Sequence, residues 1–220
     1  MNKKKIGVLL SGCGVFDGTE IHESVLTLLF IDQAGAEAVC FAPDIPQAQV
    51  INHLTQQEEK ETRNVLVESA RIARGEIQNI NNVDVAQLDA VILPGGFGAA
   101  KNLSEFAFKG PQGEVNKDVV TLLKKIVKSK KPLGALCIAP ATVGMALKEI
   151  SPELTIGNDE GITGALTSIG VKHTLCKVDE IVVDEKNRIV TSPAYMLGSG
   201  IADVAKGIKK LVEKVIQLAV

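Results

Sequence analysis

Short, unbroken apolar runs alternate with longer amphipathic segments along most of the chain. The runs at 6–10, 38–42, 90–93 and 133–136 are four or five residues long and consist mainly of small and branched apolar residues. Runs of this kind are typical of parallel strands that are covered on both faces of a sheet. The pattern therefore predicts an α/β fold in which buried strands and surface helices follow one another.

The first unit of this pattern runs from residue 6 to residue 42. A helix is expected over 20–34, because apolar side chains recur there at helical spacing and Gly35 can end it. A strand, a helix and a strand within about forty residues form a right-handed parallel unit. The residues that share the apolar face of this helix are Ile21, Val25, Leu28 and Leu29.

The rest of the chain continues the alternation, without an internal repeat, a low-complexity segment or a linker. One doubly wound, three-layer domain spanning residues 1–220 is the expectation. The segments 84–89 and 106–116 are expected to be a connector and a loop. Helices are expected at 62–73, 115–129, 139–149, 161–170 and 201–218, and strands at 154–156, 181–183 and 189–191.

Composition narrows the class of protein. Of the 220 residues, 45% are hydrophobic and only 3% aromatic, which suits an aliphatic core between helices. The net charge is -2 and no basic block occurs, so nucleic acid is not an expected partner. No apolar run approaches the roughly 18 residues of a membrane span, and the run Lys3-Lys4-Lys5 is interpreted as a solvated end rather than a signal peptide. The four cysteines form no C-x-x-C pair, so we expect reduced thiols and a cytoplasmic location.

The segment around Cys137 carries the clearest chemical signal. A buried strand at 133–136 turns abruptly into a helix there, and the flanking residues Ala135 and Ala139 are small enough for a sharp turn. This pattern predicts a nucleophile elbow with cysteine in place of serine. The sulfur would lie beside a helix N-terminus, whose free N–H groups favour a thiolate. The alternative is a buried cysteine with a purely structural role.

Glu20 and Glu23 begin the helix that follows the first strand, on the same sheet edge as the elbow. Each is a candidate partner of the thiol. Acidic residues are also favoured at any helix start, because they complement the helix dipole, so an exposed carboxylate is the alternative for both. The spacing alone does not decide between these interpretations.

Two other motifs are weaker. The loop Gly12-x-Gly14 resembles a dinucleotide fingerprint, but the position of the third glycine holds Asp17. The three histidines are His22, His53 and His173, and a structural or exposed role is expected for each. His173 with Cys176 lacks the ligand set of a metal site, so no metal is expected.

Several of these motifs together resemble the PfpI superfamily, which includes the parkinsonism-associated deglycase and class I glutamine-amidotransferase-like proteins. The resemblance is closer to its ElbB group of glyoxalase-like proteins, and it covers nearly the whole chain. The matching runs are Ser11-Gly12-Cys13-Gly14-Val15, Glu20-Ile21-His22-Glu23, Pro94-Gly95-Gly96-Phe97-Gly98-Ala99-Ala100-Lys101-Asn102-Leu103, Cys137-Ile138-Ala139-Pro140-Ala141 and Thr191-Ser192-Pro193-Ala194-Tyr195-Met196.

The resemblance implies a flavodoxin-like three-layer sandwich with a mostly parallel sheet and, commonly, a homodimer. It implies that Cys137 is the reactive thiol and that Glu23 is the acid hydrogen-bonded to it, since Glu23 lies twelve residues before Gly35 as the family's acid does. It also implies that the N–H groups of Gly96 and Ile138 serve as oxyanion donors. Gly95 belongs to the same substrate-binding loop.

Departures from the family pattern narrow the expected chemistry. Protease-like relatives carry a histidine directly after the nucleophile, where this chain has Ile138. Deglycase-type relatives carry a histidine about twenty residues after the elbow, where this chain has Ile156-Gly157-Asn158-Asp159. The late His-x-Glu of glutaminases is also missing near 192–194. Proteolysis and glutamine hydrolysis are therefore not expected.

A thiolate without an evident histidine suits a small, strongly electrophilic dicarbonyl substrate. We expect a glutathione-independent, glyoxalase-like enzyme without cofactor, which converts glyoxal or methylglyoxal to glycolate or lactate. Repair of glycated amines shares this aldehyde chemistry, and the sequence does not separate the two. The alternative is a redox-sensing or stress-related protein whose pocket cysteine oxidises readily.

Overall fold

The computed structural model describes residues 3–219. Its centre is a seven-stranded sheet with the order β3-β2-β1-β4-β5-β9-β8, in which every pair is parallel except β8 with β9. A separate pair, β6 and β7, is also parallel. The strands are β1 (Lys5–Leu9), β2 (Glu37–Ala42), β3 (Ile77–Asn79), β4 (Ala90–Leu93), β5 (Leu133–Leu136), β6 (Glu153–Leu154), β7 (Lys172–His173), β8 (Val182–Asp184) and β9 (Ile189–Ser192).

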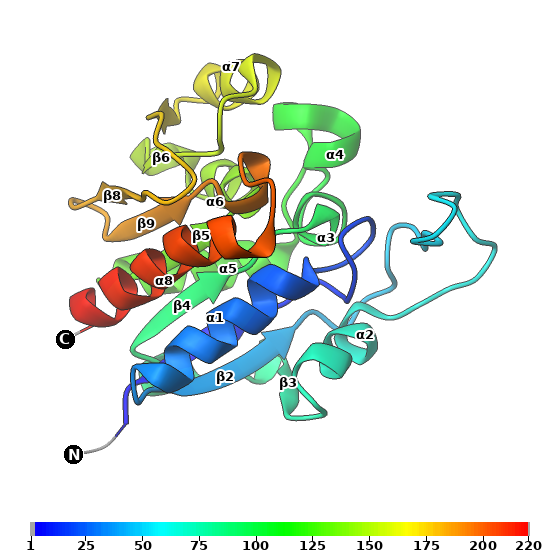
Figure 1. The fold of residues 1–220 in the computed structure, drawn as a ribbon, viewed down its shortest axis with the longest axis horizontal. Helices are drawn as coiled ribbons and strands as arrows, with labels where there is room; N and C mark the ends of the chain where they lie inside the picture. The colour runs from blue at the N-terminus through cyan, green and yellow to red at the C-terminus, as the bar shows by residue number, and fades with distance from the viewer. Residues whose placement is uncertain (1–2, 220) are drawn as a thin grey trace.

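Helices cover both faces of the sheet. Helices α1 and α8 lie side by side on the face turned to the viewer in Figure 1, and α5 and α6 pack together on the other face. This three-layer arrangement confirms the expected α/β class and flavodoxin-like sandwich. The helices are α1 (Ile21–Gln33), α2 (Val65–Ile72), α3 (Phe97–Lys101), α4 (Phe106–Lys109), α5 (Lys117–Lys128), α6 (Ala139–Ala146), α7 (Glu160–Ser168) and α8 (Ile201–Leu218).

The core lies around the central strands. Every residue of β4 and β5 is buried, as expected for parallel strands with helices on both sides. Gly134 in β5 lets α8 approach closely, because a Cβ there would lie 2.9 Å from Leu211 Cδ2 and 3.1 Å from Val215 Cγ2. The missing side chain therefore fixes how near α8 packs to the sheet.

The apolar stripe of α1 is not its buried face. Ile21, Val25 and Leu29 are 43%, 50% and 43% exposed. The side of α1 that faces the protein carries Glu23, Ser24 and Thr27 among its buried residues. Helical periodicity locates this helix but not its buried face, which combines Glu23 with Leu26 and Ile31, while the hydroxyls of Ser24 and Thr27 donate to carbonyl oxygens of the preceding turn.

Several short elements differ from the sequence-based expectations, and α3 is one that was not expected. Strand β3 and strand β7 were not expected, because neither contains an apolar run that could mark it. The segment 106–116, expected to be a loop, contains α4 and a short 3₁₀ helix, η3 (Gly110–Gln112). Three further 3₁₀ helices are η1 (Ile80–Asn82), η2 (Val85–Gln87) and η4 (Lys148–Ile150).

The carboxyl ends of β1, β4, β5 and β9 meet at one edge of the sheet, where open α/β sheets place their sites. The turn after β9 contains a fifth 3₁₀ helix, η5 (Ala194–Met196), which leads into α8. The segment 43–64 projects from the body beyond this edge (Figure 1). Within residues 3–219 no helix is long and apolar enough to cross a membrane.

Candidate active site

Cys137 lies at the turn between β5 and α6 with a left-handed backbone, φ 57°, which a non-glycine residue adopts at a cost. Its backbone N–H donates to the carbonyl oxygen of Ser192 over 3.0 Å, which ties the turn to the end of β9. The flanking alanines, Ala135 and Ala139, are fully buried. These features are those of a nucleophile elbow, and they leave the sulfur at the carboxyl edge of the sheet with 7% of the residue exposed.

The sulfur of Cys137 is held by three groups. The backbone N–H groups of Gly96 and Ile138 hydrogen-bond to it, and so does the carboxyl group of Glu23. Burial and the charge of Glu23 nevertheless raise the pKa of the thiol well above its usual range, while the two N–H groups oppose this. The helix end alone therefore does not give a resting thiolate, because burial outweighs it. Glu23 is the carboxyl group that acts on the thiol.

Glu23 is fully buried in the first turn of α1, and both carboxyl oxygens have backbone donors. Oε2 accepts the N–H of Gly95 over 2.9 Å, and Oε1 accepts the N–H of Tyr195 over 3.2 Å. Burial, followed by the charge of Glu20, raises the pKa of Glu23 to about 7. A carboxyl group with such a pKa can both accept and donate a proton near neutral pH.

Two glycines after β4 allow these groups to meet. A Cβ on Gly95 would lie 2.4 Å from Cys137 Cβ and 2.7 Å from Glu23 Oε2. The side chains of Cys137 and Glu23 therefore lie directly against the backbone of Gly95. Gly96 has φ 93° and passes so near α1 that a Cβ would lie 2.3 Å from the backbone nitrogen of Glu20. The N–H of Gly95 is engaged by Glu23, whereas the N–H of Gly96 points to the sulfur.

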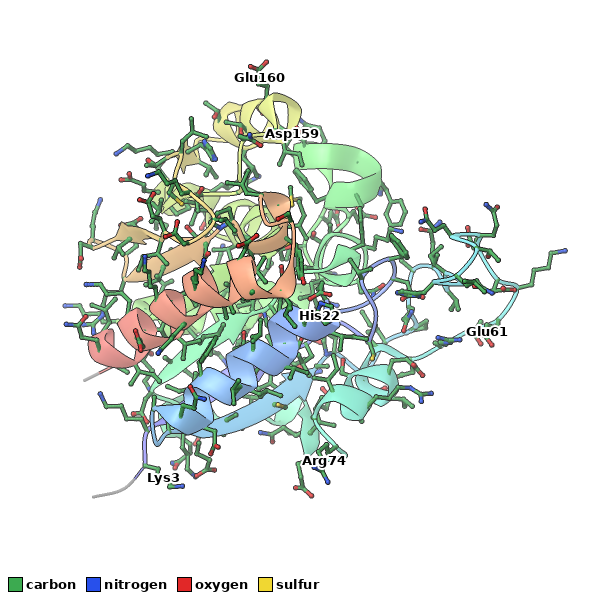
Figure 2. The ribbon with its side chains drawn as sticks, viewed as in Figure 1. Lys3, His22, Glu61, Arg74, Asp159 and Glu160 are labelled. Carbon is green, nitrogen blue, oxygen red and sulfur yellow. The ribbon has the colours of Figure 1, made fainter. Side chains whose placement is uncertain are left out.

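Glu20, His22 and Tyr195 form a second layer of the site around Glu23. Glu20 caps α1: its Oε2 accepts the N–H of Glu23 over 2.7 Å, and its own N–H donates to the carbonyl oxygen of Gly95 over 2.9 Å. His22 Nδ1 lies 2.8 Å from Tyr195 Oη and 3.9 Å from Glu20 Oε1. Figure 2 shows His22 at the amino end of α1, where this helix meets the segment that leads into α8.

Sequence reasoning did not single out Tyr195, although it is the only tyrosine of the chain. Its backbone N–H binds Glu23 and its hydroxyl binds His22, so it touches both layers of the site. The available signal was its place in the run Ser192-Pro193-Ala194-Tyr195-Met196. Ala194 before it adopts φ 41°, which turns the chain back toward α1 after β9.

The two other histidines are not brought to the thiol. His53 lies in the projecting segment, where its Nε2 accepts the N–H of Phe16 over 3.3 Å. His173 Nε2 accepts the N–H of Ile156 over 3.3 Å, so it braces the loop after β6. Among residues 3–219 no group of three His, Cys, Asp or Glu side chains could hold a metal ion.

The loop after β1 does not offer a phosphate cradle. The N–H of Gly12 donates to Ser69 Oγ over 2.8 Å, and the N–H of Gly14 donates to the carbonyl oxygen of Thr19 over 2.9 Å. Asp17 is 1% exposed, and its Oδ2 accepts the N–H of Ile51 over 2.7 Å. These amides are used within the protein, and a buried carboxylate would repel a phosphate.

The chain matches known proteins along almost its whole length. Residues 15–197 match the family described as DJ-1/PfpI family. A rat protein, "ES1 protein homolog, mitochondrial", is 45% identical over 98% of this chain and 84% of its own length. A human protein, "Glutamine amidotransferase-like class 1 domain-containing protein 3, mitochondrial", is also 45% identical, over 97% of this chain and 83% of its own. The crystal structure of an isoprenoid biosynthesis protein with an amidotransferase-like domain from Ehrlichia chaffeensis has a TM-score of 0.92 and 36% identity, covering 98% and 99% of the two chains.

These relatives correct one expectation. The rat and human proteins are mitochondrial by name, so the expectation of a cytoplasmic location is wrong. It rested on unpaired cysteines and on the lack of a signal peptide. Neither observation distinguishes the cytoplasm from another compartment that keeps thiols reduced.

Proposed function

The chain belongs to the DJ-1/PfpI family, within the class I glutamine amidotransferase-like superfamily, and from that premise we propose that it is an ElbB-type, glutathione-independent glyoxalase. Its substrate would be glyoxal or methylglyoxal, and its product glycolate or lactate. Cys137 would be the nucleophile and Glu23 the proton-transfer group. Neither a metal nor a cofactor takes part in the proposed reaction.

The observation that carries this proposal is the buried pair of Cys137 and Glu23. Within residues 3–219, the groups that shift the pKa of the thiol are Glu23 and the N–H groups of Gly96 and Ile138, and no histidine is among them. Amide hydrolysis needs a group that protonates the leaving nitrogen, a role that a histidine beside the nucleophile usually fills. An aldehyde has no leaving group, so a thiol with one carboxyl group is sufficient to attack it.

The proposed reaction uses one proton shared by the pair. Glu23 takes the proton of Cys137 while the sulfur bonds to one aldehyde carbon of glyoxal, and it returns this proton to the alkoxide to give a hemithioacetal. Glu23 then removes the hydrogen of that carbon as a proton, and the neighbouring carbonyl becomes the enolate oxygen of an enediolate. Glu23 delivers the proton to the second carbon while the hydroxyl proton of the first carbon passes to the second oxygen, which gives a thioester of glycolic acid. Water cleaves this thioester to glycolate and free thiol, so that one carbon is oxidised and the other reduced.

The backbone around the sulfur supports this assignment. The N–H groups of Gly96 and Ile138 would pass from the sulfur to the oxyanion that forms when the aldehyde is attacked, an effect worth roughly 3–4 kcal/mol per donor in other enzymes. Gly95 would act differently: its N–H holds Glu23 in place. The missing side chains at Gly95 and Gly96 leave the space in which these groups meet.

A redox-sensing role is less well supported. Sensor cysteines are exposed and of low pKa, whereas Cys137 is buried and its pKa is raised by burial and by Glu23. The pair is better suited to form a thiolate only when a substrate arrives. We therefore favour the enzyme over the sensor.

The direct test measures loss of glyoxal and appearance of glycolate with dialysed protein, without glutathione. Cys137→Ala should reduce glycolate formation to the uncatalysed rate, because the bond-forming sulfur is gone. Cys176→Ala is the matched control and should retain wild-type turnover, since Cys176 lies against Thr155 instead. Undiminished glycolate formation by Cys137→Ala would overturn the proposal.

We further propose that residues 1–220 form one domain and that two copies associate through α1. The first proposal is supported by a sheet that combines strands from both halves of the chain and by the packing of α8 on α1. The second is supported by the exposed stripe Ile21, Val25 and Leu29, since a stripe of this kind on a helix is typical of an interface. A dimer of this form would lie next to the site, because α1 also carries Glu23.

A further inference from the structure

The second layer of the site contains a histidine after all. Although no histidine contacts the sulfur, His22 is one residue from Glu23 and shares two neighbours with it. Glu20 binds the N–H of Glu23 through Oε2 and faces His22 through Oε1. Tyr195 binds Glu23 through its backbone N–H and His22 through its hydroxyl.

The positions of these groups differ in exposure. Glu23 is fully buried and Glu20 is 8% exposed, whereas the side chain of His22 is 54% exposed. The imidazole is therefore open to solvent, while the carboxyl groups behind it are covered. The rings of His22 and Tyr195 lie 5.9 Å apart and tilted, with the hydroxyl on Nδ1. The hydroxyl thus holds the imidazole over Glu20.

We propose that His22, held by the hydroxyl of Tyr195, is a positioning residue whose charge, acting through Glu20, sets the pH at which the Cys137–Glu23 pair becomes reactive. The inference deepens the proposed function of the same site. His22 does not touch the substrate in this proposal. It changes the field in which Glu23 holds its proton.

A positive charge on His22 would favour release of a proton from the Cys137–Glu23 pair. The charge of Glu20 raises the pKa of Glu23, second only to burial. An imidazolium 3.9 Å from Glu20 would offset that charge and make it easier for the pair to release a proton. Histidine is the side chain that gains or loses charge near neutral pH. Without it, Glu20 would act on Glu23 unopposed.

The elements next to this layer carry further charged groups. Burial raises the pKa of Tyr195, and the charges of Glu20 and Glu23 raise it further. The same two carboxylates therefore act on this side chain. On α8, which packs against η5, Asp203 accepts a hydrogen bond from Ser199 Oγ over 2.8 Å and faces Lys206 at 3.9 Å. The loop before α7 contacts Met196 through Gly157. The acidic residue nearest to Gly157 in this loop is Asp159, whose side chain caps α7.

The experiment measures alkylation of Cys137 by iodoacetamide against pH, with the modified residue identified by mass spectrometry. His22→Gln should move the midpoint upward by about half a pH unit, a modest shift because the imidazole is half exposed and screened. His22→Lys retains a positive charge and should restore a midpoint near or below that of the wild type. Tyr195→Phe keeps the backbone N–H on Glu23 but releases His22, so it should also move the midpoint upward. The control, His53→Gln, should leave it unchanged.

The mediation by Glu20 has its own test. Glu20→Gln keeps an oxygen for the N–H of Glu23 and should lower the midpoint by about one unit, because the opposing charge is removed. In that background, adding His22→Gln should produce less than half of the shift that it produces in the wild type. An equal shift in both backgrounds would overturn the route through Glu20, and no shift in His22→Gln would overturn the inference as a whole.

The two proposals can fail separately. Glyoxal turnover of the same variants is measured alongside alkylation. If the wild type does not form glycolate but the alkylation shifts appear as described, the glyoxalase proposal fails and the role of His22 stands. If Cys137 of the wild type resists alkylation at every pH, the role of His22 fails, and glycolate formation alone decides the glyoxalase proposal.

Discussion

The backbone N–H of Tyr195 donates a hydrogen bond to Glu23 Oε1 over 3.2 Å, across 172 positions of the sequence. It joins the turn after β9 to the first turn of α1. The opposite oxygen, Oε2, is held by Gly95 after β4. One buried carboxyl group therefore connects three segments at the carboxyl edge of the sheet. Its ionisation should be visible in the stability of the whole fold.

We predict that ionisation of Glu23 makes the folded protein less stable as the pH rises. The pKa of Glu23 is raised from 4.5 to about 7 in the folded state, so the folded state binds the proton more tightly than the unfolded one. The contribution of Glu23 to the free energy of unfolding is therefore complete below about pH 4.5. It is lost as the pH rises through about 7. The loss at pH 8 should amount to roughly 3 kcal/mol.

Denaturant unfolding of the wild type and of Glu23→Gln at pH 5 and pH 8 measures this effect. The variant has no ionisable side chain at position 23. Its free energy of unfolding relative to that of the wild type should therefore increase from pH 5 to pH 8. The control is Glu160→Gln, at the exposed start of α7, which should follow the wild type. Parallel pH dependence in Glu23→Gln and the wild type would contradict the prediction.

Gly95→Ala should damage the site through sterics alone. Its Cβ would lie 2.4 Å from Cys137 Cβ, and neither backbone can move away easily. We expect a loss of about 1–3 kcal/mol in unfolding free energy and at least a tenfold slower alkylation of Cys137. Gly164→Ala in α7 is the matched control: nothing lies within 4 Å of its Cβ, so it should gain about 0.5–1 kcal/mol and leave alkylation unchanged. Equal effects of the two substitutions would show that space at Gly95 is not limiting.

Asn102 should anchor the projecting segment 43–64. Its side chain is 7% exposed: Nδ2 donates to the carbonyl oxygens of Ser11 and Asp17 over 2.9 and 2.8 Å, and Oδ1 accepts the N–H of Ala48 over 2.8 Å. Asn102→Ala would leave buried polar groups unpaired and should cost about 2–3 kcal/mol. Limited proteolysis should then cleave the segment 43–64 faster than in the wild type.

The control for this prediction is Asn158→Ala, at an exposed position in the loop before α7. It should change neither the unfolding midpoint nor the rate of cleavage. Unchanged cleavage in Asn102→Ala would mean that the segment is held by other contacts, such as that of Asp17 with Ile51.

The sequence predicted the strands and the elbow better than it predicted the surroundings of the sulfur. Runs such as 90–93 and 133–136 become strands with the expected bounds, because continuous burial requires continuous apolarity. The role of Tyr195 could not be read from such a pattern, since its contacts with Glu23 and His22 depend on the backbone turn at Ala194.

The orientation of α1 was equally inaccessible to periodicity. An apolar stripe ordinarily faces the core, yet the buried side of this helix holds Glu23 beside Leu26 and Ile31, and a second apolar stripe is exposed. The hydrophobic pattern identifies an apolar face. It does not say whether the protein's own core or another molecule covers that face.

If a second copy of the chain covers the stripe, a charge at its centre should separate the copies. Val25 is 50% exposed and lies one helical turn from both Ile21 and Leu29. We expect Val25→Glu to convert a dimer to a monomer, as measured by light scattering on a size-exclusion column, because burying an unpaired carboxylate is costly. Leu54→Glu is the control: Leu54 is 93% exposed on the projecting segment, away from α1, and the variant should remain dimeric. A monomeric wild type at micromolar concentration, or a dimeric Val25→Glu, would exclude this face as the interface.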